Sequence, residues 1–185
     1  MGRTEQDLKD ASEHVKYEIG MLRGTTSFLA RSAGAADPVT WNAYVESFAL
    51  HLRNLIDFFY KRQGREDDIL AEHYVSDAAR WANDRGQLTP FLRGEKDRAN
   101  KRVEHLSFGR LLTDDRGWRC AEIRAQLQPV MKCFLSHLPA ERKPWFPGVG
   151  PEGPSGPSGT SSPPVERSWT GPPEPPDPEK AKTSE

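Results

Sequence analysis

Apolar residues in this sequence recur every three or four positions, and this spacing constrains the fold more than any other feature. The clearest example runs through Val45, Phe48, Leu52, Leu55 and Phe59. Residues at this spacing lie on one face of an α-helix, whereas a half-buried strand would alternate with period two. No segment alternates for long enough to indicate a strand. The sequence therefore predicts an all-α fold, a helical bundle of four to five helices.

The expected helices have recognisable starts. Asp37-Pro38 and Thr89-Pro90 each place a capping side chain before a proline that suits the first helical position. The second helix has apolar residues, Leu50 and Phe58, outside its main stripe, so we expect it at the centre of the bundle. The expected ranges are about 4 to the low thirties, 38–62, one or two short helices within 67–83, 90–110 and 118–138.

A change in composition divides the chain near residue 147. Residues 147–185 contain eleven prolines and six glycines and almost nothing apolar to bury. Such a segment cannot offset the entropy that it would lose on ordering. We therefore expect a helical bundle domain at residues 1–146 and a disordered proline-rich tail at residues 147–185.

Charge and cysteine content predict the setting of the protein. The net charge is −1, so no global electrostatic attraction to nucleic acid or to a membrane is expected. Cys120 and Cys133 lie about 20 Å apart along one expected helix, too far to form a disulfide with each other. No apolar run approaches the ~20 residues of a membrane span, and the first residues have no apolar signal core. These features predict a cytoplasmic protein with no membrane partner.

One face of the fourth expected helix carries cations and an imidazole. Arg98 and His105 lie seven residues apart, nearly on one line of the helix, and Lys101 and Arg102 flank them. Cations can hold a phosphodiester, and an imidazole can move protons near neutral pH. Because the line lies opposite Val103, we expect the cluster to face outward or into a cleft. The alternative is a basic, solvated helix face.

Polar residues also interrupt the strongly apolar second helix. Arg53 and Asp57 are four residues apart and can pair along the helix, and His51 and Asn54 accompany them. Polar groups in a mostly buried helix need partners. We therefore expect part of this cluster to meet the basic face across a groove. The alternative is an internal salt bridge that holds the bundle in register.

No metal or cofactor motif stands out. Cys133 and His137 lie four residues apart, but no second pair completes a zinc site. Asp68, Glu72, His73 and Asp77 have helical spacing, which is more typical of a solvated acidic face than of a divalent ion site. We therefore expect neither a metal nor a cofactor.

Two strings in the sequence resemble a known family. HLRNLIDFF at residues 51–59 and NKRVEHL at residues 100–106 resemble small uncharacterised bacterial helical proteins and, more loosely, the HEPN superfamily (higher eukaryotes and prokaryotes nucleotide-binding). The resemblance covers roughly residues 45 to 110. The HEPN signature is an Arg, four to six residues, then a His, and Arg98 and His105 match it. Ala99 departs from the family, in which the residue after the Arg is often polar in catalytic members.

The resemblance implies a helical bundle and an activity. Many HEPN domains are metal-independent RNases of toxin–antitoxin or phage-defence systems. By this resemblance His105 would be the general acid or base, and Arg98 would stabilise charge on the phosphate. Lys101, Arg102 and Asn100 would bind the RNA substrate.

The resemblance also implies partners. Separately from the resemblance, the position of Arg53, Asn54 and Asp57 on the second helix predicts that they support the catalytic pair across the groove. The partners would be RNA, a second copy in a homodimer, and a cognate antitoxin or another protein. The alternative function is a non-catalytic helical interaction or nucleotide-binding module, as in other members of the superfamily.

Overall fold

The structure, a computed structural model, describes residues 3–32, 36–62, 64–101 and 117–150. The described ranges contain helices, turns and irregular segments but no strand, so the predicted all-α bundle is confirmed. No helix within these ranges combines the length and the apolar character that crossing a membrane requires. The elements in chain order are α1 (Glu5–Arg31), α2 (Pro38–Tyr60), the 3-10 helix η1 (Ala71–His73), α3 (Ala78–Asp84), α4 (Pro90–Ala99), α5 (Cys120–His137) and the 3-10 helix η4 (Lys143–Trp145).

The predicted starts of α2 and α4 are confirmed. Asp37 Oδ1 accepts hydrogen bonds from two backbone N–H groups of the first turn of α2, each at 3.0 Å. Thr89 Oγ1 accepts one from Leu92 N–H at 3.2 Å. In both helices a proline follows the cap, where its missing N–H costs nothing. The described part of α4 ends at Ala99, and the predicted continuation from residue 102 to 110 lies outside the described residues.

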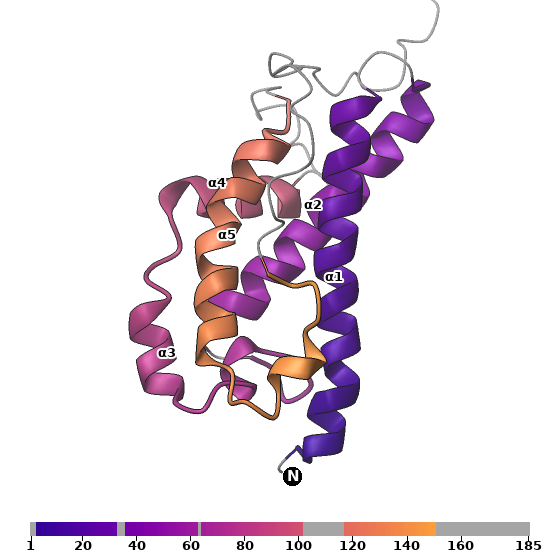
Figure 1. The fold of residues 1–185 in the computed structure, drawn as a ribbon. Coiled ribbons are helices and arrows are strands. Elements are labelled where there is room, and N and C mark those ends of the chain that lie inside the picture. Colours follow the sequence, from indigo (N-terminus) through magenta and orange to yellow (C-terminus); the bar gives the residue numbers. More distant parts are fainter. Residues whose placement is uncertain (1–2, 33–35, 63, 102–116, 151–185) are drawn as a thin grey trace, which may run out of the picture.

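The helices pack around α2 (Figure 1). α1 and α2 form a long antiparallel pair, α4 packs on α2, and α3 packs on α5. Near the end of this pair, the Phe28 ring of α1 stacks on the Tyr44 ring of α2 with their centroids 3.5 Å apart. As predicted, α2 is the central helix, because it buries residues on more than one side. Leu50 is the exception, at 42% exposed.

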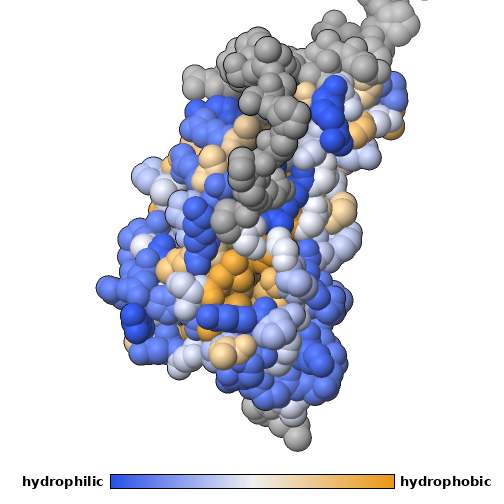
Figure 2. All heavy atoms as spheres, in the orientation of Figure 1, coloured by the Kyte–Doolittle hydropathy of each residue, from blue (hydrophilic) through white to orange (hydrophobic). Residues whose placement is uncertain are grey.

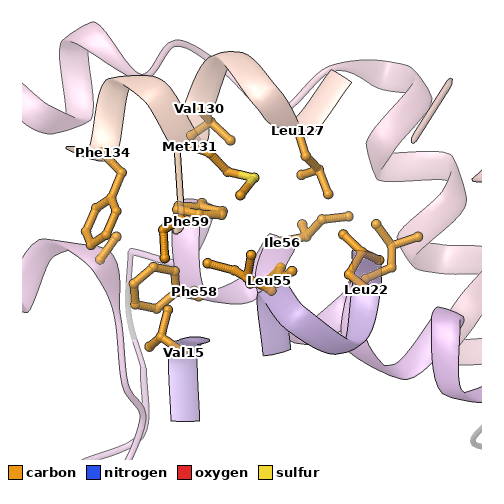
Figure 3. Close-up of a cluster of buried hydrophobic side chains, with 14 of the residues drawn as sticks. Val15, Leu22, Leu55, Ile56, Phe58, Phe59, Leu127, Val130, Met131 and Phe134 are labelled. Carbon is orange, nitrogen blue, oxygen red and sulfur yellow. The ribbon is translucent and has the colours of Figure 1, made fainter. Parts of the chain in front are cut away.

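Phe134 of α5 organises the aromatic part of the core. Apolar side chains of α1, α2 and α5 form one cluster, with Phe134 at one end of it (Figure 3). Its ring lies edge-on to those of Phe58 and Phe146, with centroids 5.3 and 5.1 Å away. It also contacts the rings of Tyr74 and Trp81. Edge-to-face geometry adds to the stabilisation from apolar burial alone, so this single residue joins α2, α3 and the carboxyl-terminal segment.

The packed part of the chain extends past the predicted boundary at residue 146. Val149 is only 2% exposed. Arg23 of α1 donates hydrogen bonds to three successive backbone oxygens, those of Gly148 at 2.5 Å, Val149 at 3.0 Å and Gly150 at 2.6 Å. The composition of the tail could not predict this contact, because one buried apolar residue and hydrogen bonds from one distant arginine are enough to hold a short segment on the bundle. Residues 151–185 of the predicted tail lie outside the described residues.

Candidate functional site

The predicted catalytic pair is only partly within the described residues. Arg98, Asn100 and Lys101 lie at the carboxyl end of α4, whereas Arg102 and His105 lie outside the described ranges. Lys101 is exposed and Asn100 is half-buried. The buried Oδ1 of Asn100 has no hydrogen-bond partner among the described residues. How these side chains lie relative to His105 stays a prediction.

Arg98 does not face outward. Its side chain is 12% exposed, and its guanidinium carbon lies 4.4 Å from the centroid of the Trp118 ring. Its Nη1 lies 3.4 Å from Glu95 Oε2 and 3.5 Å from the Gly117 oxygen. Of the two placements expected for this face, outward or into a cleft, the outward one is therefore wrong for Arg98. Its physical cause is a long-range contact, because the segment before α5 packs back on α4 and supplies both an aromatic face and a carbonyl.

The contacts around Glu95 hold α4 to the beginning of α5. Glu95 is 7% exposed, although it is charged. It forms ion pairs with Arg98 of its own helix and, at 3.7 Å, with Nη2 of Arg119, the N-cap residue of α5. A buried carboxylate is tolerated when cations and hydrogen bonds compensate its lost hydration. Arg119 also lies over the Phe91 ring, 4.4 Å from its centroid, so the link includes apolar contact.

The polar residues of α2 link it to its neighbours. His51 Nδ1 lies 2.7 Å from Glu18 Oε2 of α1, and Asn54 Nδ2 donates to the same oxygen at 3.2 Å. Asp57 pairs with Lys96 of α4. Asp57 thus meets α4 across the bundle, through Lys96 and not through a described contact with Arg98. These links are of the kind expected for residues that hold a bundle in register.

A polar groove opens between α1, α2 and the residues that follow α2. It encloses about 390 Å³, and Arg53, Asn54 and Asp57 all line it. Two of its charges are matched within the groove, since Lys61 Nζ lies 2.5 Å from Asp68 Oδ2. The hydrogen bond from Lys61 is the largest cause that lowers the pKa of Asp68. A hydrogen bond from the backbone N–H of Arg65 lowers this pKa further. Lys61 and Asp68 therefore offer little uncompensated charge to a ligand in this groove.

A second pocket lies where α2 ends, beside α3, and we call it the basic pocket. It encloses about 260 Å³. Lys61 and Arg62, directly after α2, and Arg85, directly after α3, bring three cations to its wall, of which Lys61 is already paired with Asp68. Among the described residues that line it, Glu72 is the single carboxylate. The remaining lining residues are apolar: Phe58, Phe59, Trp81 and Ala82.

Two arginines in the basic pocket act on each other. Burial, and next the charge of Arg62, lower the pKa of Arg85, while Tyr60 and then Glu72 act in the opposite direction. Within the described residues neither arginine forms an ion pair. Arg85 is instead held by the Tyr60 ring, 5.0 Å from its guanidinium carbon, and by the Tyr60 oxygen at 3.4 Å. Arg62 is exposed and Arg85 is half-buried, and an anion between two like charges favours the charged form of both.

Sequence reasoning missed the basic pocket. Lys61, Arg62 and Arg85 each follow the end of a helix, where cations are common because they complement the helix dipole. Nothing in their spacing shows that the ends of α2 and α3 come together. Only the packing of Trp81 beside Phe58 and Phe59 in one core brings the three cations to one wall.

The side chains weighed as metal ligands have other contacts. His137 Nε2 lies 3.1 Å from Asp84 Oδ2. His73 contacts Arg3, and Asp68 pairs with Lys61. Across the described ranges no three His, Cys, Asp or Glu side chains are grouped as a metal site requires.

Comparison with protein-family models, with curated proteins and with solved structures found no match in any of the three.

Proposed function

We propose that this protein is a non-catalytic binding module that holds the phosphate group of a ribonucleotide in the basic pocket. The observation that carries the proposal is the placement of Arg62 and Arg85 together, without a described carboxylate in ion-pair contact with either. A phosphate supplies the missing negative charge. Its oxygens also match the planar fork of donors that a guanidinium presents.

The shape of the basic pocket supports a ligand larger than phosphate alone. About 260 Å³ is several times the ~30 Å³ that one water occupies in the liquid. The rest of the lining, beyond the charged side chains, is apolar and nearly buried, with Phe58 at 6% and Trp81 at 2% exposed. A phosphate at the rim with a sugar or base against this apolar wall would use both halves of the pocket.

The proposal is tested by calorimetric titration of the full chain with a ribonucleoside monophosphate and with the matching ribonucleoside. We expect binding of the monophosphate and none of the nucleoside. Arg85→Gln should weaken binding by about tenfold or more, because a charge-assisted hydrogen bond contributes ~1.5–3 kcal/mol. Arg80→Gln is the matched control, since Arg80 is an exposed arginine of α3 that pairs with Asp84 outside the pocket. Equal losses for both variants, or no binding by the wild type, would contradict the proposal.

A competition experiment distinguishes free nucleotide from RNA. Short single-stranded RNA that displaces the monophosphate, with an apparent affinity that falls steeply as salt rises, would identify RNA as the source of the phosphate. A monophosphate that RNA cannot displace would identify a small-molecule site. Both outcomes agree with a phosphate that binds to Arg62 and Arg85, and they differ only in the molecule that carries it.

Cleavage of RNA by Arg98 and His105 is a second proposal, favoured by the exposed Lys101 at the end of α4. It also includes the HEPN-like assignment, a homodimer and an antitoxin-type partner. The enclosed position of Arg98 against Trp118 is less favourable to it, because the guanidinium would have to leave these contacts to reach a phosphate. Catalysis without a metal predicts cutting in EDTA and 2′,3′-cyclic phosphate ends, both lost in His105→Ala. Intact RNA after incubation with the wild type would end this proposal and leave phosphate binding untouched.

A further inference from the structure

The residues between α2 and η1 are held by an arginine from the amino-terminal end of the chain. Arg3, just before α1, donates through Nη2 to the backbone oxygens of Glu66 and Asp68, each at 2.6 Å. Its Nη1 lies 2.7 Å from Nδ1 and 2.9 Å from Nε2 of His73, the last residue of η1. One side chain therefore ties residues 66–73 to the beginning of α1.

The contacts of His73 require a neutral ring. Two donors converge on its Nδ1, namely Arg3 Nη1 and the backbone N–H of Leu70, which is 3.2 Å away. A nitrogen that accepts a hydrogen bond keeps its lone pair, so Nδ1 carries no proton in this arrangement. The protonated ring has an N–H at both nitrogens and would turn a donor toward these donors. Protonation of His73 therefore breaks the hydrogen bond from Leu70 and places a second positive charge beside Arg3.

The surroundings of His73 also favour the neutral ring. The end of the bundle at which the amino terminus lies is largely hydrophilic on the face that Figure 2 shows. Arg142, in the segment before η4, donates to the backbone oxygen of His73 at 3.0 Å, and Glu5 of α1 is already paired with Arg142. Burial, and next the charge of Arg3, lower the pKa of His73, while the charge of Glu72 on η1 has a smaller, opposite effect.

The residues that Arg3 holds form one wall of the polar groove. We call residues 65–70 the groove wall, because four of them line the groove: Arg65, Asp68, Ile69 and Leu70. The other lining residues belong to α1 and to α2 with the residue that follows it. The groove wall has a second link, from Lys61 to Asp68, that does not involve His73. Loss of the contacts of His73 would therefore change the groove locally and leave the bundle folded.

We propose that Arg3 and His73 form a pH-sensitive clasp on the polar groove. With the ring neutral, the clasp holds the groove wall in place. With the ring protonated, Arg3 and Leu70 lose their acceptor, the groove wall is released from η1 and the groove opens. Because the closed clasp disfavours the protonated ring, it is complete near pH 7.5 and opens as the pH falls below about 6.5.

The δ-methyl group of Ile69 reports on the groove wall, and that of the buried Ile56 is the internal reference. The experiment follows both by NMR in the full chain, labelled with ¹³C at its isoleucine methyl groups, from about pH 7.5 to pH 5. The Ile69 resonance should shift with the same midpoint as the His73 ring, and Ile56 should stay in place. A soluble gadolinium chelate should broaden Ile69 more at the acid end, because the released wall is more exposed. A shift without added broadening would overturn the proposal.

Histidine variants identify the group that titrates. His73→Gln should remove the acid shift of Ile69. His14→Gln is the matched control, since His14 is an exposed histidine that lines the same groove, and it should keep the shift. An acid shift of Ile69 that persists in His73→Gln, or that is lost equally in both variants, would overturn the proposal.

Arginine variants separate a clasp from a merely structural contact. Arg3→Gln removes a cation that opposes protonation, so the midpoint of the His73 ring should rise. The same variant should place the Ile69 resonance at pH 7.5 near its acid position in the wild type. Arg31→Gln, at an exposed arginine in the last turn of α1, should change neither. An unchanged His73 midpoint in Arg3→Gln would contradict the clasp.

Discussion

Arg98 and Trp118 form a cation–π contact of 4.4 Å that joins the end of α4 to the segment before α5. Arg98→Ala removes this contact and one cation of the buried Glu95, so we expect a loss of about 1–3 kcal/mol in the free energy of unfolding. Denaturant unfolding followed by circular dichroism measures it. Arg93→Ala, an exposed arginine on the same helix, should change stability by less than ~0.5 kcal/mol. Equal, small effects would mean that Arg98 contributes no more than a surface residue.

Phe134 is expected to be among the most sensitive positions of the core. Phe134→Ala should cost about 3–5 kcal/mol, the usual range for a phenylalanine removed from a packed interior. Leu50→Ala, at a position 42% exposed, should cost far less. Thermal unfolding of both variants provides the comparison. A mild effect of Phe134→Ala would contradict its place at the meeting point of α2, α3 and α5.

Tyr74 carries a buried hydroxyl without a hydrogen-bond partner among the described residues. Its ring is fully buried, and burial raises the pKa of Tyr74 to about 12. An unsatisfied hydroxyl costs roughly 1–3 kcal/mol by mutational data. Tyr74→Phe keeps the ring and removes the hydroxyl, so it should leave stability unchanged or raise the unfolding midpoint. A clear loss of stability would show that the hydroxyl is paired.

His73 should make the fold weaker in mild acid. Burial, and next the charge of Arg3, lower the pKa of His73 below its ordinary 6.5. Near pH 6.5 this histidine is therefore protonated more readily in the unfolded chain than in the folded one. As a result, the free energy of unfolding decreases as the pH falls through about 6.5. The neutral ring also accepts a hydrogen bond from Leu70 N–H, at 3.2 Å, on Nδ1. Urea midpoints between about pH 7.5 and pH 5.5 should decline less in His73→Gln than in the wild type; identical slopes would contradict the assignment.

Much of the fold could be predicted from local signals. Asp37 and Thr89 were visible as caps because their chemistry acts on the next three residues. The apolar stripe of α2 predicted its central position, because helical periodicity is also local. Val149 is different: it is buried, its backbone oxygen is bound by Arg23, more than a hundred positions earlier, and no local pattern marks such a contact.

The site was harder to predict than the fold for the same reason. Arg98 lies on a helix line that its spacing defines, but its direction depends on Trp118, which approaches from a separate segment. Arg62 and Arg85 stand at the ends of different helices and share no sequence motif. Both cases require the tertiary contacts of the bundle, which spacing alone does not contain.

The most direct test of phosphate binding in the basic pocket is NMR of the arginine Nε–H groups in the full chain. A ribonucleoside monophosphate is titrated into ¹⁵N-labelled protein, and each arginine is assigned by substitution with Gln. The account predicts saturable shifts of Arg62 and Arg85 with one common dissociation constant, while Arg80 and Arg93 stay unmoved. Shifts spread evenly over all exposed arginines, or no saturable shift of Arg85, would contradict it.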